Sequence, residues 1–236
     1  MIFAQIMAGG VGKRMGNTEL PKQFLKLADK PILIHTLEKF IIFTDFERIL
    51  VSAHPNWVQY TKDLIDKFIN DKRIIVIEGG QERNDTVMAA ISYIEKKYGP
   101  NATHTLLMHD AVRPFVTHRI IRENIVKSKE FMAVDTLIGA TDTIVSVDGG
   151  VITDIPVRDR MYQGQTPQTV NIDKFKEYYN SMSATDKLKL SDSAKVMLLA
   201  GCQVGVVKGE LSNTKITTPY DLKISEIIAR EGLDVH

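Results

Sequence analysis

Two patterns of apolar and polar residues alternate along the first half of the chain. Short β-branched apolar runs, typical of buried strands, occupy residues 2–7, 49–53, 74–77 and 105–109. Between them, apolar residues recur at helical spacing from Pro31 onward and over 58–69 and 84–97. Strands that alternate with crossover helices build a mostly parallel sheet, so this half of the chain predicts an α/β fold.

The regular alternation of predicted strands and helices ends after Pro114. A helix is expected over 118–130 and a strand over 133–139. Two β-branched runs, 143–147 and 151–155, then flank Asp148, Gly149 and Gly150 and predict a hairpin. The hairpin either projects as an arm that joins a second subunit or forms an ordinary edge ribbon. Helices over 172–182 and 191–200, a strand over 203–207 and a helix from Pro219 complete the pattern.

Composition excludes several classes of protein. The 236 residues suit one or two domains, and a net charge of +1 creates no field that would attract nucleic acid or an anionic membrane. Cys202 is the single cysteine, so no internal disulfide can form, which suits a reducing compartment. No apolar stretch approaches the roughly 20 residues that span a bilayer. We therefore expect a soluble cytoplasmic protein without nucleic-acid or membrane partners.

The segment AGGVGKRMG follows the first predicted strand directly. Glycines at a strand end let the backbone turn sharply and present N–H groups to an anion. A dinucleotide fingerprint starting at Gly10 would need glycine where Met15 stands, which weakens the hydride-transfer interpretation. A P-loop would need serine or threonine where Arg14 stands, so a P-loop ATPase is also disfavoured.

Two cations flank this glycine-rich segment. Arg14 lies within it, and Lys22 follows in the run PKQFL. An arginine fork and a lysine point charge on either side of such a loop can clamp a triphosphate. Both side chains could instead be solvated, but Pro21 restricts the backbone before Lys22 and favours a positioned side chain.

Two further segments follow predicted strands. GGQERNDT, residues 79–86, opens a helix, so Asn84 and Thr86 could contact a ligand, or Asn84 or Asp85 could simply cap the helix. HDAVRPF places Asp110 and Arg113 at the carboxyl end of a strand, where the ligand crevice of an open parallel sheet lies. Asp110 could face Mg²⁺ or a substrate hydroxyl, or pair with Arg113 alone. The six histidines show no metal-site spacing.

Taken in order, the segments AGGVGKRMG, PKQFL, GGQERNDT, HDAVRP, TPQ and TKITTPYDL resemble the family of sugar-alcohol-phosphate cytidylyltransferases. The resemblance implies a Rossmann-like three-layer nucleotidyltransferase fold with a mostly parallel sheet, formed by residues 1–236 as a single domain. It also implies a projecting β-arm at about 141–160 that is used in a homodimer. The expected substrates are CTP and a sugar-alcohol phosphate, with Mg²⁺ bound mainly through the CTP phosphates and no protein metal site.

The same resemblance suggests roles for individual residues. Arg14 and Lys22 match the pair that stabilises the transition state. Other matched positions contact CTP or position the acceptor. The CTP contacts are Met7, Ala8, Gly9, Gly10, Gly80, Gln81, Glu82, Arg83, Asn84, Asp85 and Thr86. The acceptor-positioning residues are Arg158, Lys215 and Thr143, joined by Asp110 and Arg113 from their place at the strand end.

Within this family, three features resemble the ribitol 5-phosphate branch rather than the 2-C-methyl-D-erythritol 4-phosphate branch. They are the Gly9–Gly10 pair in place of Ala-Gly, Val112 in place of alanine, and the tract MYQGQTPQ. We therefore expect CDP-ribitol and pyrophosphate as products, with a role in teichoic acid and cell-wall biosynthesis. Transfer to methylerythritol phosphate is the alternative, and a non-catalytic nucleotide-binding protein a more distant one.

Overall fold

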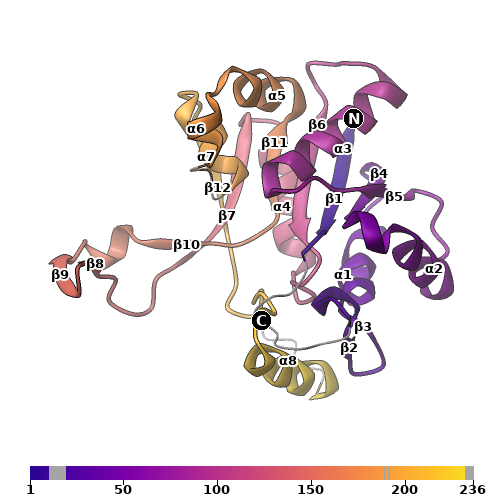
Figure 1. Ribbon diagram of the computed structural model, residues 1–236, viewed down its shortest axis with the longest axis horizontal. Coiled ribbons are helices and arrows are strands. Elements are labelled where there is room, and N and C mark those ends of the chain that lie inside the picture. Colours follow the sequence, from indigo (N-terminus) through magenta and orange to yellow (C-terminus); the bar gives the residue numbers. More distant parts are fainter. Residues whose placement is uncertain (11–19, 189, 191, 232–236) are drawn as a thin grey trace.

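The computed structural model describes residues 1–10, 20–188, 190 and 192–231. In these residues eight strands form one sheet, in the order β10-β7-β11-β6-β1-β4-β5, with β12 pairing with β7 (Figure 1). The strands are β1 (Ile2–Ala8), β4 (Phe46–Ala53), β5 (Ile74–Glu78), β6 (Thr105–Asp110), β7 (Ala133–Gly139), β10 (Tyr162–Gly164), β11 (Gln168–Asn171) and β12 (Val204–Lys208). The mostly parallel α/β sheet is therefore confirmed.

The predicted strands of the first half form the parallel centre of this sheet. β1 lies between β4 and β6, and β5 extends the sheet beyond β4. The register places Met7 opposite Asp110, so the ends of β1 and β6 lie side by side. Because parallel strands end at the same edge, the segments that follow β1, β5 and β6 meet there.

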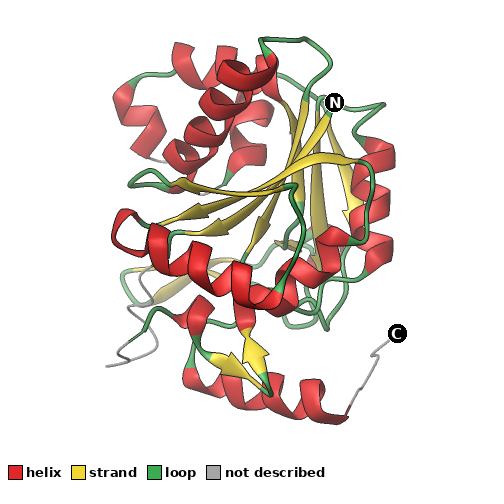
Figure 2. Cartoon of the chain, turned by 90° about the vertical axis from the view of Figure 1, so that its right-hand side faces the viewer, coloured by secondary structure: helices red, strands yellow, loops and turns green. Residues whose placement is uncertain are grey.

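Helices cover both faces of the sheet (Figure 2). Alternate residues of each strand point to opposite faces. Ile6 and Leu107 pack with one group of helices, whereas Phe3 and Met108 pack with the other. The first group is α1 (Ile32–Ile41), α2 (Val58–Phe68) and α4 (His118–Lys127); the second is α3 (Arg83–Tyr98), α5 (Ile172–Ser181) and α7 (Ser193–Leu199). The result is the expected three-layer arrangement.

Most predicted helices have the expected boundaries within a few residues. α1 begins directly after Pro31, and α3 ends at Gly99, whose φ of 76° is the left-handed backbone that glycine accepts easily. α4 ends at Lys127, three residues before the predicted end at 130. The short helix α6 (Ala184–Leu188) was not predicted.

β11 is the main departure from the predicted pattern. It runs antiparallel between β6 and β7, with Gln168 opposite Met108 and Thr169 opposite Val134. β10, which precedes β11 in the sequence, pairs antiparallel with β7. These strands span only three or four residues each, too few to show a clear alternation. Their insertion brings the TPQ tract against the end of β6.

Residues 141–160 form the predicted arm, which projects from the body of the molecule (Figure 1). Its hairpin pairs β8 (Ser146–Asp148) with β9 (Val151–Asp154) and turns at Gly149 and Gly150, both with positive φ. Pairing begins at Ser146 rather than at the predicted residue 143. Val147, Val151, Ile152 and Ile155 are all more than half exposed, so the arm leaves an apolar surface open.

The C-terminal helix α8 (Pro219–Glu231) packs beside the short ribbon of β2 (Lys26–Leu27) and β3 (Lys30–Pro31). A small apolar cluster joins these elements through Leu27, Ile32, Val112 and Ile216. This packing brings the TKITTPYDL segment close to the end of β6. Among the described residues, no helix has the length and apolar character needed to cross a membrane.

Candidate functional site

A cavity of about 460 Å³ opens at the carboxyl ends of β1 and β6. Three of the predicted segments converge on it, namely those that follow β1, β5 and β6, together with Lys215 from the C-terminal segment. The predicted site residues that line the cavity are Met7, Gly9, Gly10, Lys22, Gly80, Gln81, Glu82, Arg83, Thr86, Asp110 and Lys215. This volume falls within the range of small-molecule sites.

Lys22 is held at the cavity by a short helical turn. Pro21 precedes this turn with a φ of −54°, the value that its ring favours, and Lys22 itself is buried. The neighbouring Gln23 donates from Nε2 to the carbonyl oxygen of Ala8 at 2.6 Å. This bond ties the turn to the end of β1. Arg14, the other predicted cation, lies outside the described residues.

The N-terminus of α3 forms a second wall. Glu82 is the N-cap residue, and it forms a reciprocal capping box with Asp85, so Asp85 takes part in the cap but is not the N-cap residue itself. Gly80 packs so closely on this turn that a Cβ there would lie 2.4 Å from the Asp85 Cβ, and no other residue fits. Its amide donates to Thr86 Oγ1 at 3.1 Å. The positive end of the helix dipole therefore faces the cavity, as an anion site requires.

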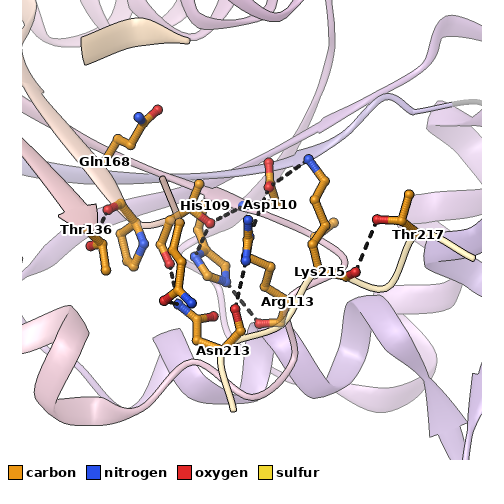
Figure 3. A network of polar contacts seen from close by, with 12 residues as sticks. His109, Asp110, Arg113, Thr136, Gln168, Asn213, Lys215 and Thr217 are labelled. Atoms are coloured by element: carbon orange, nitrogen blue, oxygen red, sulfur yellow. Dashed lines mark hydrogen bonds and ion pairs between the residues drawn. The ribbon is translucent and has the colours of Figure 1, made fainter. Parts of the chain in front are cut away.

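Asp110 is the centre of the charged part of the site (Figure 3). Its Oδ1 accepts from Arg83 Nη1 at 2.9 Å. Its Oδ2 lies 3.0 Å from Lys215 Nζ and 3.3 Å from Arg113 Nε. The alternative in which Asp110 pairs with Arg113 alone is therefore wrong, because Asp110 contacts three cations from three separate segments. A single buried carboxylate thus links α3, the end of β6 and the C-terminal segment.

The three cations determine the charge state of Asp110. Burial alone would raise its pKa, because a carboxylate loses hydration in the interior. Arg83, Lys215 and Arg113 more than offset this and hold the pKa of Asp110 well below its usual range. The side chain is therefore ionised throughout the neutral range.

A layer of hydrogen bonds beneath the cavity fixes the position of Asp110. Its backbone amide donates to Thr166 Oγ1 at 3.2 Å. His109 contacts Thr166 Oγ1 through Nδ1 at 2.9 Å and the Arg113 carbonyl through Nε2 at 3.0 Å. Because the carbonyl can only accept, Nε2 carries the proton and the Thr166 hydroxyl donates to Nδ1. Burial lowers the pKa of His109 to about 4, so the ring stays neutral.

Asn213 connects this layer to the C-terminal segment. Its carbonyl accepts from Arg113 Nη1 at 2.7 Å, and its side-chain amide donates to the carbonyl of Thr166 at 2.8 Å. Asn213 is fully buried and lies two residues before Lys215. The position of Lys215 at the cavity is therefore set by contacts to both β6 and the TPQ tract.

Behind Arg83 lies a second buried carboxylate. Arg83 Nη2 donates to Gln168 Oε1 at 3.1 Å, and Gln168 Nε2 donates to Asp135 Oδ1 at 3.0 Å. Burial raises the pKa of Asp135 to about 6, and nearby Asp192 adds to this effect while the bond from Gln168 opposes it. The pKa values of Asp110 and Asp135 shift in opposite directions, because Asp110 contacts three cations directly and Asp135 contacts none among the described residues.

Several predicted site residues do not line the cavity. Ala8 is buried in β1, Asn84 accepts from Ser193 Oγ, and Asp85 accepts from Tyr179 as well as capping α3. Thr143 and Arg158 lie on the exposed arm, away from the cavity of their own chain. Arg113 lies beside the cavity, behind Asp110.

Sequence reasoning missed other residues at the site. Gln23, Ala111 and Val112 also line the cavity. The supporting Thr166 and Gln168 belong to the TPQ tract, which contributed to the family resemblance but was given no site role. The polar residues of this tract could have indicated a role at the site. Its position against the end of β6 follows from the antiparallel insertion of β11, which the sequence pattern did not predict.

The carboxylates in the described part of the chain do not form a preassembled metal site. Among the described residues, no three histidine, cysteine, aspartate or glutamate side chains cluster as metal ligands would. Asp110 is the buried carboxylate of the cavity, and both of its oxygens already contact cations. At most one lone-pair position remains, which fits a metal held chiefly by substrate phosphates.

The family model for 2-C-methyl-D-erythritol 4-phosphate cytidylyltransferase, IspD, matches residues 2–231. The chain belongs to the IspD family. IspD-family enzymes are cytidylyltransferases, a class of nucleotidyltransferase, and they bind CTP and a sugar phosphate. The expectation of a cytidylyltransferase is confirmed at this level.

Solved structures of IspD enzymes share the fold of this chain. The 2-C-methyl-D-erythritol 4-phosphate cytidylyltransferase of Francisella tularensis is 26% identical, with a TM-score of 0.79 over 96% of this chain and 98% of that one. The 4-diphosphocytidyl-2C-methyl-D-erythritol synthase of Anaerococcus prevotii is 23% identical, with a TM-score of 0.79 over 97% and 98%. The Thermus thermophilus enzyme is 24% identical, with a TM-score of 0.73 over 98% and 100%.

The raised pKa of Asp135 predicts a pH-dependent stability difference. Its folded pKa of about 6 exceeds the ordinary value of 3.8, so its contribution to stability is full below pH 3.8 and is lost as the pH rises through 6. Asp135→Asn removes the titrating group, so the variant does not lose this stability as the pH rises. We expect the free energy of unfolding of the variant, relative to the parent, to rise by about 2–3 kcal/mol between pH 4 and pH 7.5.

Urea denaturation at both pH values measures this difference. Both proteins contain His109, which is neutral when folded and lowers the free energy of unfolding as the pH falls from 6.5 toward 4. Subtracting the parent's value from the variant's cancels this opposite contribution. A difference that stays constant with pH would show that Asp135 is not penalised by burial.

Proposed function

We propose that the protein transfers the cytidylyl group of CTP to D-ribitol 5-phosphate, giving CDP-ribitol and pyrophosphate. The observation that carries this choice of acceptor is the position of Val112 in the cavity wall, where the methylerythritol branch has alanine. Val112 packs against Ile216 and its carbonyl accepts from the Ile216 amide at 2.9 Å, next to Lys215. A valine at this point of the wall would leave less room than an alanine, which would favour the unbranched ribitol chain over a methyl-branched one.

Transfer to 2-C-methyl-D-erythritol 4-phosphate is the second candidate. It is favoured by the description of the matching family and by the names of the solved relatives. Both reactions would use the same nucleotide and the same chemistry. They differ only in the acceptor, so the wall around Val112 and the residues near Lys215 would decide between them.

The nucleotide would bind between the glycine-rich segment and the N-terminus of α3. Gly10 lines the cavity, and a Cβ at this position would meet no atom of the described residues within 4 Å, which would leave room for a phosphate beside the backbone. Lys22 would lie beside the triphosphate and offset charge on the α-phosphoryl oxygens as the phosphorus becomes five-coordinate. Arg14 is proposed as its partner.

The acceptor phosphate would bind near Lys215. Its second pKa is about 6, so near neutral pH the phosphate is largely dianionic and needs no general base to attack the α-phosphorus. Asp110 holds Lys215 in place but is surrounded by cations, which makes it a poor proton acceptor. Positioning and charge neutralisation would therefore supply the rate acceleration.

IspD-family enzymes generally use CTP with a divalent metal ion. Mg²⁺ bound to the triphosphate would neutralise phosphate charge and stabilise the pyrophosphate leaving group. Among the described residues, Asp110 and Glu82 are the carboxylates of the cavity wall, and they belong to no cluster of three metal ligands. Lys22 and Arg83, with the proposed Arg14, would add positive charge to the nucleotide wall.

We also propose that the arm completes the site of a second subunit in a homodimer. Thr143 and Arg158 are exposed and do not reach the cavity of their own chain. The exposed Val151 and Ile155 give the arm an apolar surface that burial against another subunit would stabilise. In a two-fold dimer each arm would then bring Arg158 to the acceptor end of the other cavity.

The choice of acceptor is tested by pyrophosphate release. The protein with CTP and Mg²⁺ should release pyrophosphate with ribitol 5-phosphate, with a kcat/KM at least about tenfold above that for 2-C-methyl-D-erythritol 4-phosphate. The reverse preference would establish the second candidate. No release with either acceptor would contradict both.

The shared site is tested by mixing two defective subunits. Lys22→Ala should lower kcat by roughly 10²-fold or more, and Arg158→Ala should raise the KM for the acceptor. A co-expressed mixture contains dimers with one intact cavity, so at low acceptor concentration it should recover about a quarter of the parent activity. Recovery no greater than the mean of the two variants would contradict an arm that acts in trans. Lys26→Ala, on the exposed face of β2, is the matched control and should retain full activity.

A further inference from the structure

A chain of buried polar contacts runs from the cavity into the sheet. It passes from Asp110 to Arg83, from Arg83 to Gln168 and from Gln168 to Asp135, with distances of 2.9, 3.1 and 3.0 Å. The last two residues lie outside the cavity wall. We infer that Gln168 and Asp135 are positioning residues that orient the Arg83 guanidinium toward bound CTP. This inference rests on the proposed assignment of Arg83 to the nucleotide wall.

The geometry of Arg83 makes it depend on this support. Its two terminal nitrogens are held by Asp110 and Gln168, while its buried Nε has no hydrogen-bond partner among the described residues. Among the described residues, two contacts thus set the plane of the guanidinium. Loss of either contact would let the fork rotate, and a planar fork binds phosphate well only in one orientation.

Asp135 determines which end of the Gln168 side chain faces Arg83. A carboxylate can only accept, so it draws the amide nitrogen of Gln168 toward itself. The amide oxygen must then point at Arg83, which can only donate. Gln168 is 2% exposed, so water cannot satisfy the opposite orientation. Without Asp135, the amide could turn its N–H groups toward the guanidinium.

Asp135 also carries a cost that its local surroundings do not offset. It is 8% exposed and contacts no cation directly among the described residues. The charged groups that influence it are Asp192, which disfavours ionisation, and Arg83, which favours it. Carboxylates whose pKa is strongly shifted by burial cluster at functional sites. A role in orienting Arg83 explains why a carboxylate is buried here.

The experiment reverses the polarity of the bond between the two residues. Gln168→Glu places a second carboxylate about 3 Å from that of Asp135, so that the two repel each other. The double variant Gln168→Glu with Asp135→Asn keeps the total charge and restores the bond, since the introduced amide can donate to the introduced carboxylate, which also accepts from Arg83. The dissociation constant of CTP with Mg²⁺ is measured by calorimetry at pH 8, without an acceptor.

We expect Gln168→Glu to weaken CTP binding about tenfold, and the double variant to return to within about threefold of the parent. Gln59→Glu is the matched control, because Gln59 donates to Asp63 at 2.8 Å on the exposed surface of α2, and it should bind CTP normally. An unchanged constant in Gln168→Glu, or a double variant that binds no better than Gln168→Glu, would overturn the inference.

Thermal unfolding shows whether each variant is folded. If Gln168→Glu does not fold, Asp135→Leu removes the acceptor without adding charge and should also weaken CTP binding, whereas normal binding would overturn the inference. Because no acceptor substrate is present, failure of the ribitol 5-phosphate assignment leaves this test intact. If the parent itself does not bind CTP, the proposed function and the inference both fall.

Discussion

The ion pairs around Asp110 are the interaction on which the site depends. Arg83, Arg113 and Lys215 come from positions far apart in the chain and would repel one another without a carboxylate between them. Asp110 would in turn be too costly to bury without them. The four side chains are therefore stable only together, and their assembly joins the segment proposed to hold CTP to the segment proposed to hold the acceptor phosphate.

The sheet makes this assembly possible. Pairing of β1 with β6 brings Met7 level with Asp110, and the antiparallel insertion of β11 places Thr166 and Gln168 against the same strand end. Hydrogen bonds from this layer fix the backbone of Asp110 and the plane of Arg83. The cavity wall thus rests on a layer of buried polar residues, which explains how flexible cationic side chains can be held in defined positions.

Much of the fold could be predicted from the sequence because the central strands and helices are long and strongly periodic. The four parallel strands of the first half, and helices such as α1 and α3, follow directly from their apolar spacing and their proline and glycine boundaries. β10 and β11 could not be predicted, since three or four residues carry no clear period and their pairing is decided by contacts with β6 and β7. The apolar spacing of a segment therefore predicts its own secondary structure, but it does not predict between which strands a short strand inserts.

The same distinction applies to the site. Asp110, Lys22 and the GGQERNDT segment could be placed at the cavity because residues after parallel strands meet at one edge. The partners of Asp110 depended on three-dimensional packing. Its pairing with Lys215 spans more than a hundred residues, and no spacing rule links them. In the sequence Asp135 is one polar residue in a predicted strand, and its contact with Gln168 depends on the unpredicted strand β11.

Steady-state kinetics of Asp110→Asn measure the central role of this carboxylate most directly. The variant keeps the size of the side chain but leaves Arg83, Arg113 and Lys215 without their shared counterion. If Asp110 joins the two substrate segments, the KM for CTP and the KM for the acceptor should both rise, each by about tenfold or more. Normal values for both substrates, or a change confined to one of them, would contradict the account.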